Sequence, residues 1–368
     1  MRCKILLVAT LLLLVPTAGN VTAQIIYGQP VSGGIGFTYS SWSLDQDGET
    51  TDLTQFATPL QGFVPLADNF EAMLYIDNSS NKLETGGVES KLNGLGDVRL
   101  QVSHSFSEDR FVFGLGLNLP TGKKKLTTDE EVIVLTALSQ SYFTVPMRRF
   151  GQGLGITATL GAATLLGEWR CGVGASYQYT GKYDPYEGVT DYNPGDVFTV
   201  NVGFDRTFDK ITTSADVIFS SYAADQLEDE DVFKQSTQVS ITGGIEYAAE
   251  KYRLGGTLSY LARGRNDLYT GEDSELKIYG DEFRIAGQML YLASERIMIG
   301  PMIDFRSIAE NDLGYGSSSI LGFGALFSAG LSDQFNLNSG LKYFTGSTDG
   351  GDIDLSGLQL SFGLSASM

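Results

Sequence analysis

The sequence has very few of the side chains that metal centres and nucleophilic catalysis require. It contains one histidine, His104, and two cysteines, Cys3 and Cys171. A structural zinc site needs about four such ligands, and a serine–histidine site needs a base held beside its serine by a third group. The glycine-rich stretches also lack the strand–helix context of phosphate-binding loops. We therefore expect no metal site, no cofactor and no enzyme activity.

Long apolar runs and basic side chains are also scarce. Beyond the first 23 residues, no run approaches the roughly 18 apolar residues that a membrane-spanning helix needs. Lysine and arginine number 25 against 44 aspartates and glutamates, which gives a formal net charge of −19. Such an acidic balance argues against a nucleic-acid partner.

The first residues have the pattern of a secretory signal peptide. Two basic residues and an apolar run, 5–15, precede Pro16 and small residues that end at Ala23. This pattern predicts a signal peptide over residues 1–23 with cleavage after Ala23. Cys3 leaves with the signal peptide, so Cys171 remains alone and no intramolecular disulfide can form. No linker or change of composition divides residues 24–368, which we interpret as one domain.

The pattern that the sequence does show is a repeated alternation of apolar and polar residues. In the stretch 169–180, an apolar row with Trp169, Val173 and Tyr177 alternates with small and polar residues, and 198–204 repeats the pattern. Successive side chains of a strand point to opposite faces. Arms of about 9–11 residues with one apolar row, one polar row and aromatics near the ends are typical of strands in an outer-membrane barrel. The sequence therefore predicts an all-β, transmembrane antiparallel β-barrel.

The connections between these arms alternate in length. Short turns are followed by long acidic loops, such as 223–231 and 265–280. The pattern predicts about sixteen strands, or fourteen if the N-terminal pair lies outside the wall, with both termini in the periplasm. The alternation continues to Met368, where such barrels usually end in an aromatic residue. The expected location is the outer membrane of a Gram-negative-type bacterium, and the expected partners are its lipid, lipopolysaccharide, a small-molecule solute and the barrel-assembly machinery.

The longest connection, residues 121–151, is the natural candidate to fold into the lumen. Thr127-x-x-Glu130 resembles a capping box and favours a helix, whereas the β-branched run 132–134 favours a strand, so both remain open. The lysines at its start fit either a constriction or a contact with lipopolysaccharide phosphates, or a solvated loop. The constriction candidates are Lys123, Lys124, Lys125, Glu130 and Glu131.

Charged residues of both signs occupy the row that we expect to face the lumen. One interpretation is a selectivity lining, because rings of charged side chains tune ion preference in channels. The alternative is that these charges pair across neighbouring strands and stabilise the wall. The predicted pore-lining residues are Asp97, Arg99, Arg170, Asp205, Asp216, Glu246, Arg253, Arg284, Asp304, Arg306 and Lys342.

Two short motifs resemble a known family. Gly94-Leu95-Gly96-Asp97-Val98 is followed by Leu117-Asn118-Leu119-Pro120-Thr121-Gly122. The pair is similar to motifs of the outer-membrane channels associated with meta-pathway phenol degradation, which are related in character to the toluene and fatty-acid uptake barrels. The resemblance covers mainly residues 94–165. It implies passive uptake of small hydrophobic or aromatic compounds.

Three hypotheses about function follow from these patterns. The first is the substrate-biased channel that the resemblance implies, and the second is a general diffusion porin for small polar solutes, which the charged row favours. The third is a structural or surface barrel with a plugged lumen. Aromatic side chains along a continuous pocket would favour the first hypothesis over the second, and Tyr222 and Phe344 are the inward aromatics to inspect.

Overall fold

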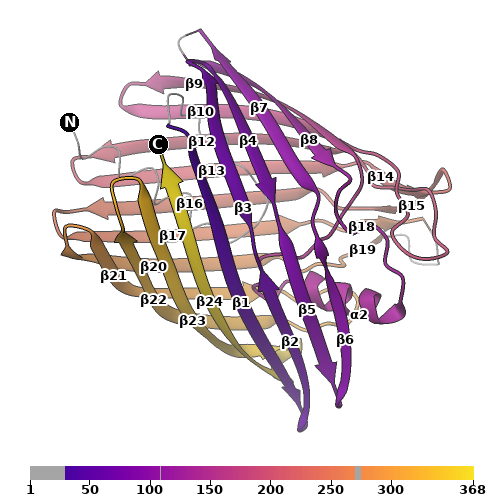
Figure 1. Cartoon of the computed structure of the whole chain (residues 1–368). Coiled ribbons are helices and arrows are strands. Elements are labelled where there is room, and N and C mark those ends of the chain that lie inside the picture. The colour runs from indigo at the N-terminus through magenta and orange to yellow at the C-terminus, as the bar shows by residue number, and fades with distance from the viewer. Residues whose placement is uncertain (1–29, 108, 270–274) are drawn as a thin grey trace.

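The chain forms a closed antiparallel β-barrel, seen from its side in Figure 1. The computed structural model describes residues 30–107, 109–269 and 275–368, so the predicted signal peptide lies outside the described residues. The barrel closes where β1 (Ser32–Gln46) pairs with both β2 (Glu49–Ala57) and β24 (Ile353–Ser367). Closure removes the free edges that an open sheet would present.

The remaining strands of the barrel sheet follow one another around the wall. In chain order they are β3 (Leu60–Ala67), β4 (Phe70–Ile76), β5 (Asn78–Thr85), β6 (Val88–Leu95), β7 (Val98–Phe106), β8 (Phe111–Leu119), β9 (Gly155–Leu166), β10 (Trp169–Thr180), β12 (Val197–Phe208), β13 (Ile211–Tyr222), β16 (Gln238–Ala248), β17 (Tyr252–Arg263), β20 (Glu282–Ser294), β21 (Ile297–Ile308), β22 (Ser318–Gly330) and β23 (Phe335–Thr348).

Sixteen wall strands are built from these pieces, because three of the strands are interrupted. β2 continues into β3, β4 into β5, and β6 into β7, each across one or two residues that lie outside the strands. The sixteen-strand prediction is confirmed, and the fourteen-strand alternative is wrong because β1 and β2 both belong to the wall. The β5–β6 hairpin was not predicted, since its outward row is polar and its inward row mixes polar residues with Leu83 and Leu92.

The outward row carries a continuous apolar surface. Val173, Ile245 and Phe323 are 50%, 55% and 49% exposed, although each has strand neighbours on both sides. Cross-strand aromatic pairs lie along one end of this apolar surface, including Trp169–Phe208 at 6.2 Å between ring centroids. An apolar belt with aromatic girdles matches a lipid bilayer. The closed barrel and this belt place the protein in the outer membrane of a Gram-negative-type bacterium.

The two ends of the barrel differ. Both described termini and a set of short turns lie at one end, here called the turn end, and the long connections lie at the other, the loop end (Figure 1). His104 lies on the outward row at the turn end, where its ring stacks on Phe106 at 6.2 Å. Its Nδ1 atom is 3.0 Å from the Asn69 carbonyl oxygen. This placement agrees with an interfacial histidine.

Three long connections form a second, small sheet at the loop end. Its strands are β11 (Tyr192–Asn193), β14 (Ala224–Leu227), β15 (Glu230–Lys234), β18 (Asn266–Leu268) and β19 (Glu275–Leu276). In Figure 1 most of it lies beyond the ends of the barrel strands on one side. The long loops are therefore ordered against one another on that side of the barrel mouth.

The connection after β8 contains the helix α2 (Asp129–Ser139), which settles the choice between helix and strand. The cap lies one residue later than predicted: Thr128 Oγ1 accepts from Glu131 N at 3.3 Å, and the Glu131 carboxylate accepts from Thr127 N at 2.8 Å. Acidic residues in the first turn also favour the helix, since they face the positive end of its dipole. A short 3-10 helix, η1 (Asp349–Gly351), precedes β24.

No helix among the described residues is long and apolar enough to cross a membrane.

Candidate functional site

Residues 121–151, here called the inserted segment, lie on the inner face of the wall. Gln55 on β2 exchanges two hydrogen bonds with the backbone of Met147, at 2.7 and 2.9 Å. Gln359 on β24 donates to the Thr144 carbonyl at 3.2 Å, and Arg306 on β21 donates to the Ser141 carbonyl. Because β2 and β21 are separated by four strands of the wall, the segment extends across a broad part of the lumen.

An apolar core fixes the segment against the wall. The Trp42 ring lies 4.7 Å from the Phe344 ring of the wall and 5.7 Å from the Phe143 ring of the segment. All three side chains are at most 2% exposed. The buried members of this core are Trp42, Leu53, Leu83, Leu92, Leu126, Val134, Leu138, Phe143, Val145, Met147, Phe150, Ile320, Phe344 and Leu355.

Asp97 joins the two ends of the segment. Its carboxylate accepts from Gly122 N at 2.9 Å and from Gln152 N at 2.7 Å, and Asn118 Nδ2 donates to it at 2.8 Å. The side chain is 6% exposed. A carboxylate that accepts several backbone N–H bonds is a strong, charge-assisted anchor. Asp97 was predicted to line the pore, and its carboxylate instead faces the base of the segment.

Glycines allow three backbone stretches, at Gly96, Gly122 and Gly151, to approach one another closely where the segment begins and ends. A Cβ atom on Gly122 would lie 2.7 Å from the Gly96 carbonyl carbon, and one on Gly151 would lie 2.8 Å from the Gly122 carbonyl carbon. Distances this short leave no room for a side chain. Gly96, Asp97 and Gly122 are residues of the two sequence motifs, so the motifs serve the anchoring of the segment in this chain.

Four of the predicted pore-lining residues come together on the inner face of β20, β21 and β23. Arg284 Nε donates to Asp304 Oδ2 at 2.8 Å, and Lys342 Nζ lies 3.8 Å from the same oxygen. Arg306 Nε is 3.1 Å from Glu282 Oε1. A further arginine, Arg263 on β17, lies 3.5 Å from the other Glu282 oxygen. The charges pair across neighbouring strands, as the stabilising interpretation expects, but the cations outnumber the carboxylates.

The other predicted lining residues are spread around the wall. Arg170 pairs with Asp205 across β10 and β12, and the Arg170 side chain is 62% exposed on the inner face. Arg99 lies 3.7 Å from Asp77 and stacks over the Tyr75 ring. The register places three further residues on the inner row: Asp216, Glu246 and Arg253. Their role as a pore lining stays a prediction.

The charged residues predicted for the constriction separate into two groups. Lys123 forms an ion pair with Glu131 inside the segment, and both side chains are at most 26% exposed. Lys124, Lys125 and Glu130 are exposed. The first pair therefore stabilises the start of α2 and is partly buried, whereas a role of the other three side chains in a constriction stays a prediction.

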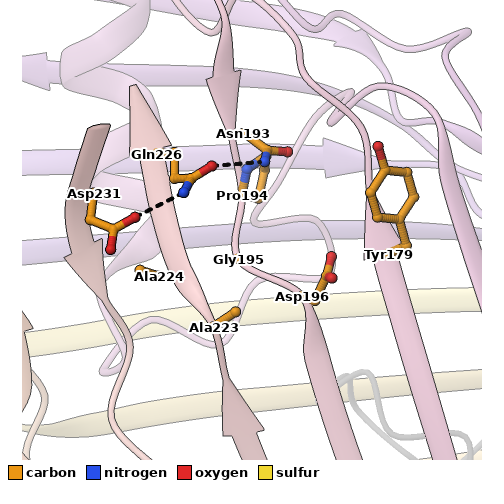
Figure 2. Close-up of a pocket in the computed structure, with 9 residues that line it drawn as sticks. All are labelled: Tyr179, Asn193, Pro194, Gly195, Asp196, Ala223, Ala224, Gln226 and Asp231. Atoms are coloured by element: carbon orange, nitrogen blue, oxygen red, sulfur yellow. Dashed lines mark hydrogen bonds between the residues drawn. The ribbon is translucent and has the colours of Figure 1, made fainter. Parts of the chain in front are cut away.

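Neither of the two inward aromatic side chains, Tyr222 and Phe344, lines the two pockets described below. Phe344 is fully buried in the core and Tyr222 is half-buried. A pocket of about 360 Å³ lies at the loop end between the barrel rim and the small sheet, and Figure 2 shows the polar groups that line it beside the ring of Tyr179. A second pocket, of about 300 Å³, is lined mainly by serine, threonine and aspartate.

Three charged residues of the lumen were missed. Glu282 and Arg263 have the same parity as the predicted Arg284 and Arg253 on their strands, so the alternation rule itself would have included them. Arg148 belongs to the inserted segment, where no strand period applies, and no sequence signal marks it.

The acidic run 228–231 forms the turn between β14 and β15. Asp229 pairs with Lys182, and Asp231 accepts from Gln226 Nε2 at 2.9 Å. In the three described ranges, no group of three or more histidine, cysteine, aspartate or glutamate residues could hold a metal ion.

Comparisons with known proteins agree with the barrel architecture. No protein-family model and no curated protein matches the sequence. Among solved structures, a ΔS2S3 mutant of the monoaromatic hydrocarbon channel TodX matches with a TM-score of 0.50 and 11% identity, over 95% of this chain and 93% of that one. The monoaromatic hydrocarbon channel CymD gives 0.44 and 13%, over 92% and 89%. An anion-selective porin from Comamonas acidovorans gives 0.43 and 12%, over 93% and 100%. At these identities the likeness concerns the fold alone.

Proposed function

We propose that this protein is an outer-membrane channel for passive passage of small molecules, with the inserted segment as its constriction. The observation that supports this function is the asymmetry of the lumen. The segment fills the inner face along β1, β2, β21 and β24, whereas the inward side chains of Ser176, Asn201 and Thr242 on β10, β12 and β16 remain partly exposed to water. A barrel of about sixteen strands is wide enough to keep an aqueous path beside such a segment.

The chemistry of the inner row favours small polar solutes. It is charged and serine-, threonine- and glycine-rich, and the inward aromatic Phe344 is sealed in the core. A second candidate is uptake of hydrophobic or aromatic compounds, which the motifs around Asp97 and Gly122 and the similarity in fold to the monoaromatic hydrocarbon channel TodX support. We propose no enzyme activity, and we propose that the loop end faces outward, with both termini in the periplasm and lipopolysaccharide around the loops.

The direct test is single-channel recording from the refolded protein, residues 24–368, in a planar bilayer. We expect steady, ohmic conductance, and liposome swelling that is faster with small sugars than with larger ones. Uptake of toluene without conductance would instead favour the hydrophobic-compound channel. The absence of both conductance and uptake would contradict the transport function and leave a structural barrel.

A further inference from the structure

The inner face next to the inserted segment carries an excess of positive charge. The cationic cluster consists of Arg148, Arg263, Arg284, Arg306 and Lys342, and it shares only two carboxylates, Glu282 and Asp304. Asp281 accepts from the backbone of Arg263 but is itself paired with Lys277, at 3.0 Å. The local excess of three cations contrasts with the net charge of −19 for the whole chain.

The cluster joins the wall to the segment. Arg306 donates to the Ser141 carbonyl, and Arg148 donates to the Phe143 carbonyl. The Arg148 Nε atom is buried and has no hydrogen-bond partner among the described residues. Burial and the neighbouring charge of Arg306 lower the pKa of Arg148 to about 10, so the side chain stays protonated at neutral pH. One donor of this charged group is thus left without an acceptor.

Like charges gathered in a partly buried region repel one another, and two carboxylates cannot balance five cations. An anion that approaches from the lumen would relieve this repulsion. Guanidinium groups present planar pairs of donors that match the two oxygens of a carboxylate or phosphate. The excess charge, the unsatisfied donor and the position beside the constriction all point to the same class of ligand.

We propose that the cationic cluster binds small oxyanions and makes the channel selective for solutes that carry a carboxylate or phosphate group. This inference rests on the proposed channel function and names its solute class. Another role for the same residues is purely structural, as a tie between segment and wall. The two roles respond differently to substitution: the structural contact needs a guanidinium group that reaches the Phe143 carbonyl, whereas the preference of the channel for anions over cations needs only the positive charge.

Arg148 separates the two roles. Arg148→Gln removes the charge, and Arg148→Lys keeps the charge but loses the bidentate geometry. In a tenfold KCl gradient we expect the wild-type zero-current potential to show preference for chloride. A unit charge about 7 Å from a permeating ion in water changes its local concentration by about threefold, so we expect Arg148→Gln to lower the chloride-to-potassium permeability ratio by at least that factor. Arg148→Lys should retain most of the preference.

Arg170→Gln is the matched control, because it removes a lumen cation that is remote from the segment and already paired with Asp205. A cation-selective wild type, or equal loss in Arg148→Gln and Arg148→Lys, would overturn the anion site while the channel function stands. If neither the wild type nor any variant conducts, the channel function is wrong. Equilibrium dialysis with 32P-phosphate then tests the anion site separately. Binding of phosphate by the wild type but not by Arg148→Gln supports the site, and the absence of binding by the folded wild type refutes it.

Discussion

Asp97→Ala is expected to release the inserted segment from its base. The substitution removes the carboxylate that accepts hydrogen bonds from Gly122 N, Gln152 N and Asn118 Nδ2. These partly buried donors are then left without that acceptor. Hydrogen bonds to charged groups contribute about 1.5–3 kcal/mol each, and unsatisfied buried donors add a cost. We expect the free energy of unfolding to fall by about 3–5 kcal/mol, measured by urea titration of the protein in lipid vesicles.

The same variant should change the channel, because both ends of the segment depend on this carboxylate. We expect noisy, fluctuating single-channel currents in place of steady ones. Asp205→Ala is the control: it removes a lumen carboxylate whose partner, Arg170, is largely exposed, and such pairs contribute about 0–1 kcal/mol. If Asp97→Ala behaves like this control in both measurements, the anchoring role of Asp97 is wrong.

Phe143→Ala should loosen the segment at its other attachment, the apolar core. Phe143 is 2% exposed and packs on Trp42 and Tyr142, at 5.7 and 4.6 Å between ring centroids. Truncation of a buried phenylalanine costs about 3–5 kcal/mol through lost burial and the cavity left behind. The barrel itself should persist, because its strand pairing does not depend on this ring.

Trp42 reports this loosening directly. Trp169→Phe leaves Trp42 as the only tryptophan, and its emission should shift to the red in Phe143→Ala as water reaches the indole. Ile133→Ala, on the exposed side of α2, is the control from the same segment, because Ile133 is 52% exposed. Unchanged emission in Phe143→Ala would show that the segment is held without the core.

The wall was predictable from the sequence where lipid and water face opposite sides of a strand. The predicted arm 169–180 coincides with β10, because its two rows differ sharply in polarity. The β5–β6 hairpin was not predictable in this way. Its outward Lys82 and Glu89 form an ion pair, and its inward row includes Ser79 and Asn81. A strand whose outward row is polar and whose inward row mixes polar and apolar residues does not show the lipid-facing pattern.

The same reasoning predicted the residues of the candidate site that lie on strands, but not those of the inserted segment. The alternation of side chains along a strand correctly placed Arg284, Asp304, Arg306 and Lys342 on the inner face, because successive residues of a strand point to opposite faces. The break between β6 and β7 at Gly96 and Asp97 ended that rule, so Asp97 appeared as a lining residue. Arg148 depends on the path of a segment held by tertiary contacts alone, which no local periodicity encodes.

Removal of the inserted segment tests most directly whether this segment narrows the pore. Lys123 O accepts from Gly151 N at 2.9 Å, so residues 124–150 can be replaced by a two-residue Gly-Ser link with little change to the wall. Single-channel conductance of this shortened protein should exceed that of the intact protein severalfold in the same salt. Equal conductance in two forms that both fold as barrels would contradict the claim and place the constriction elsewhere.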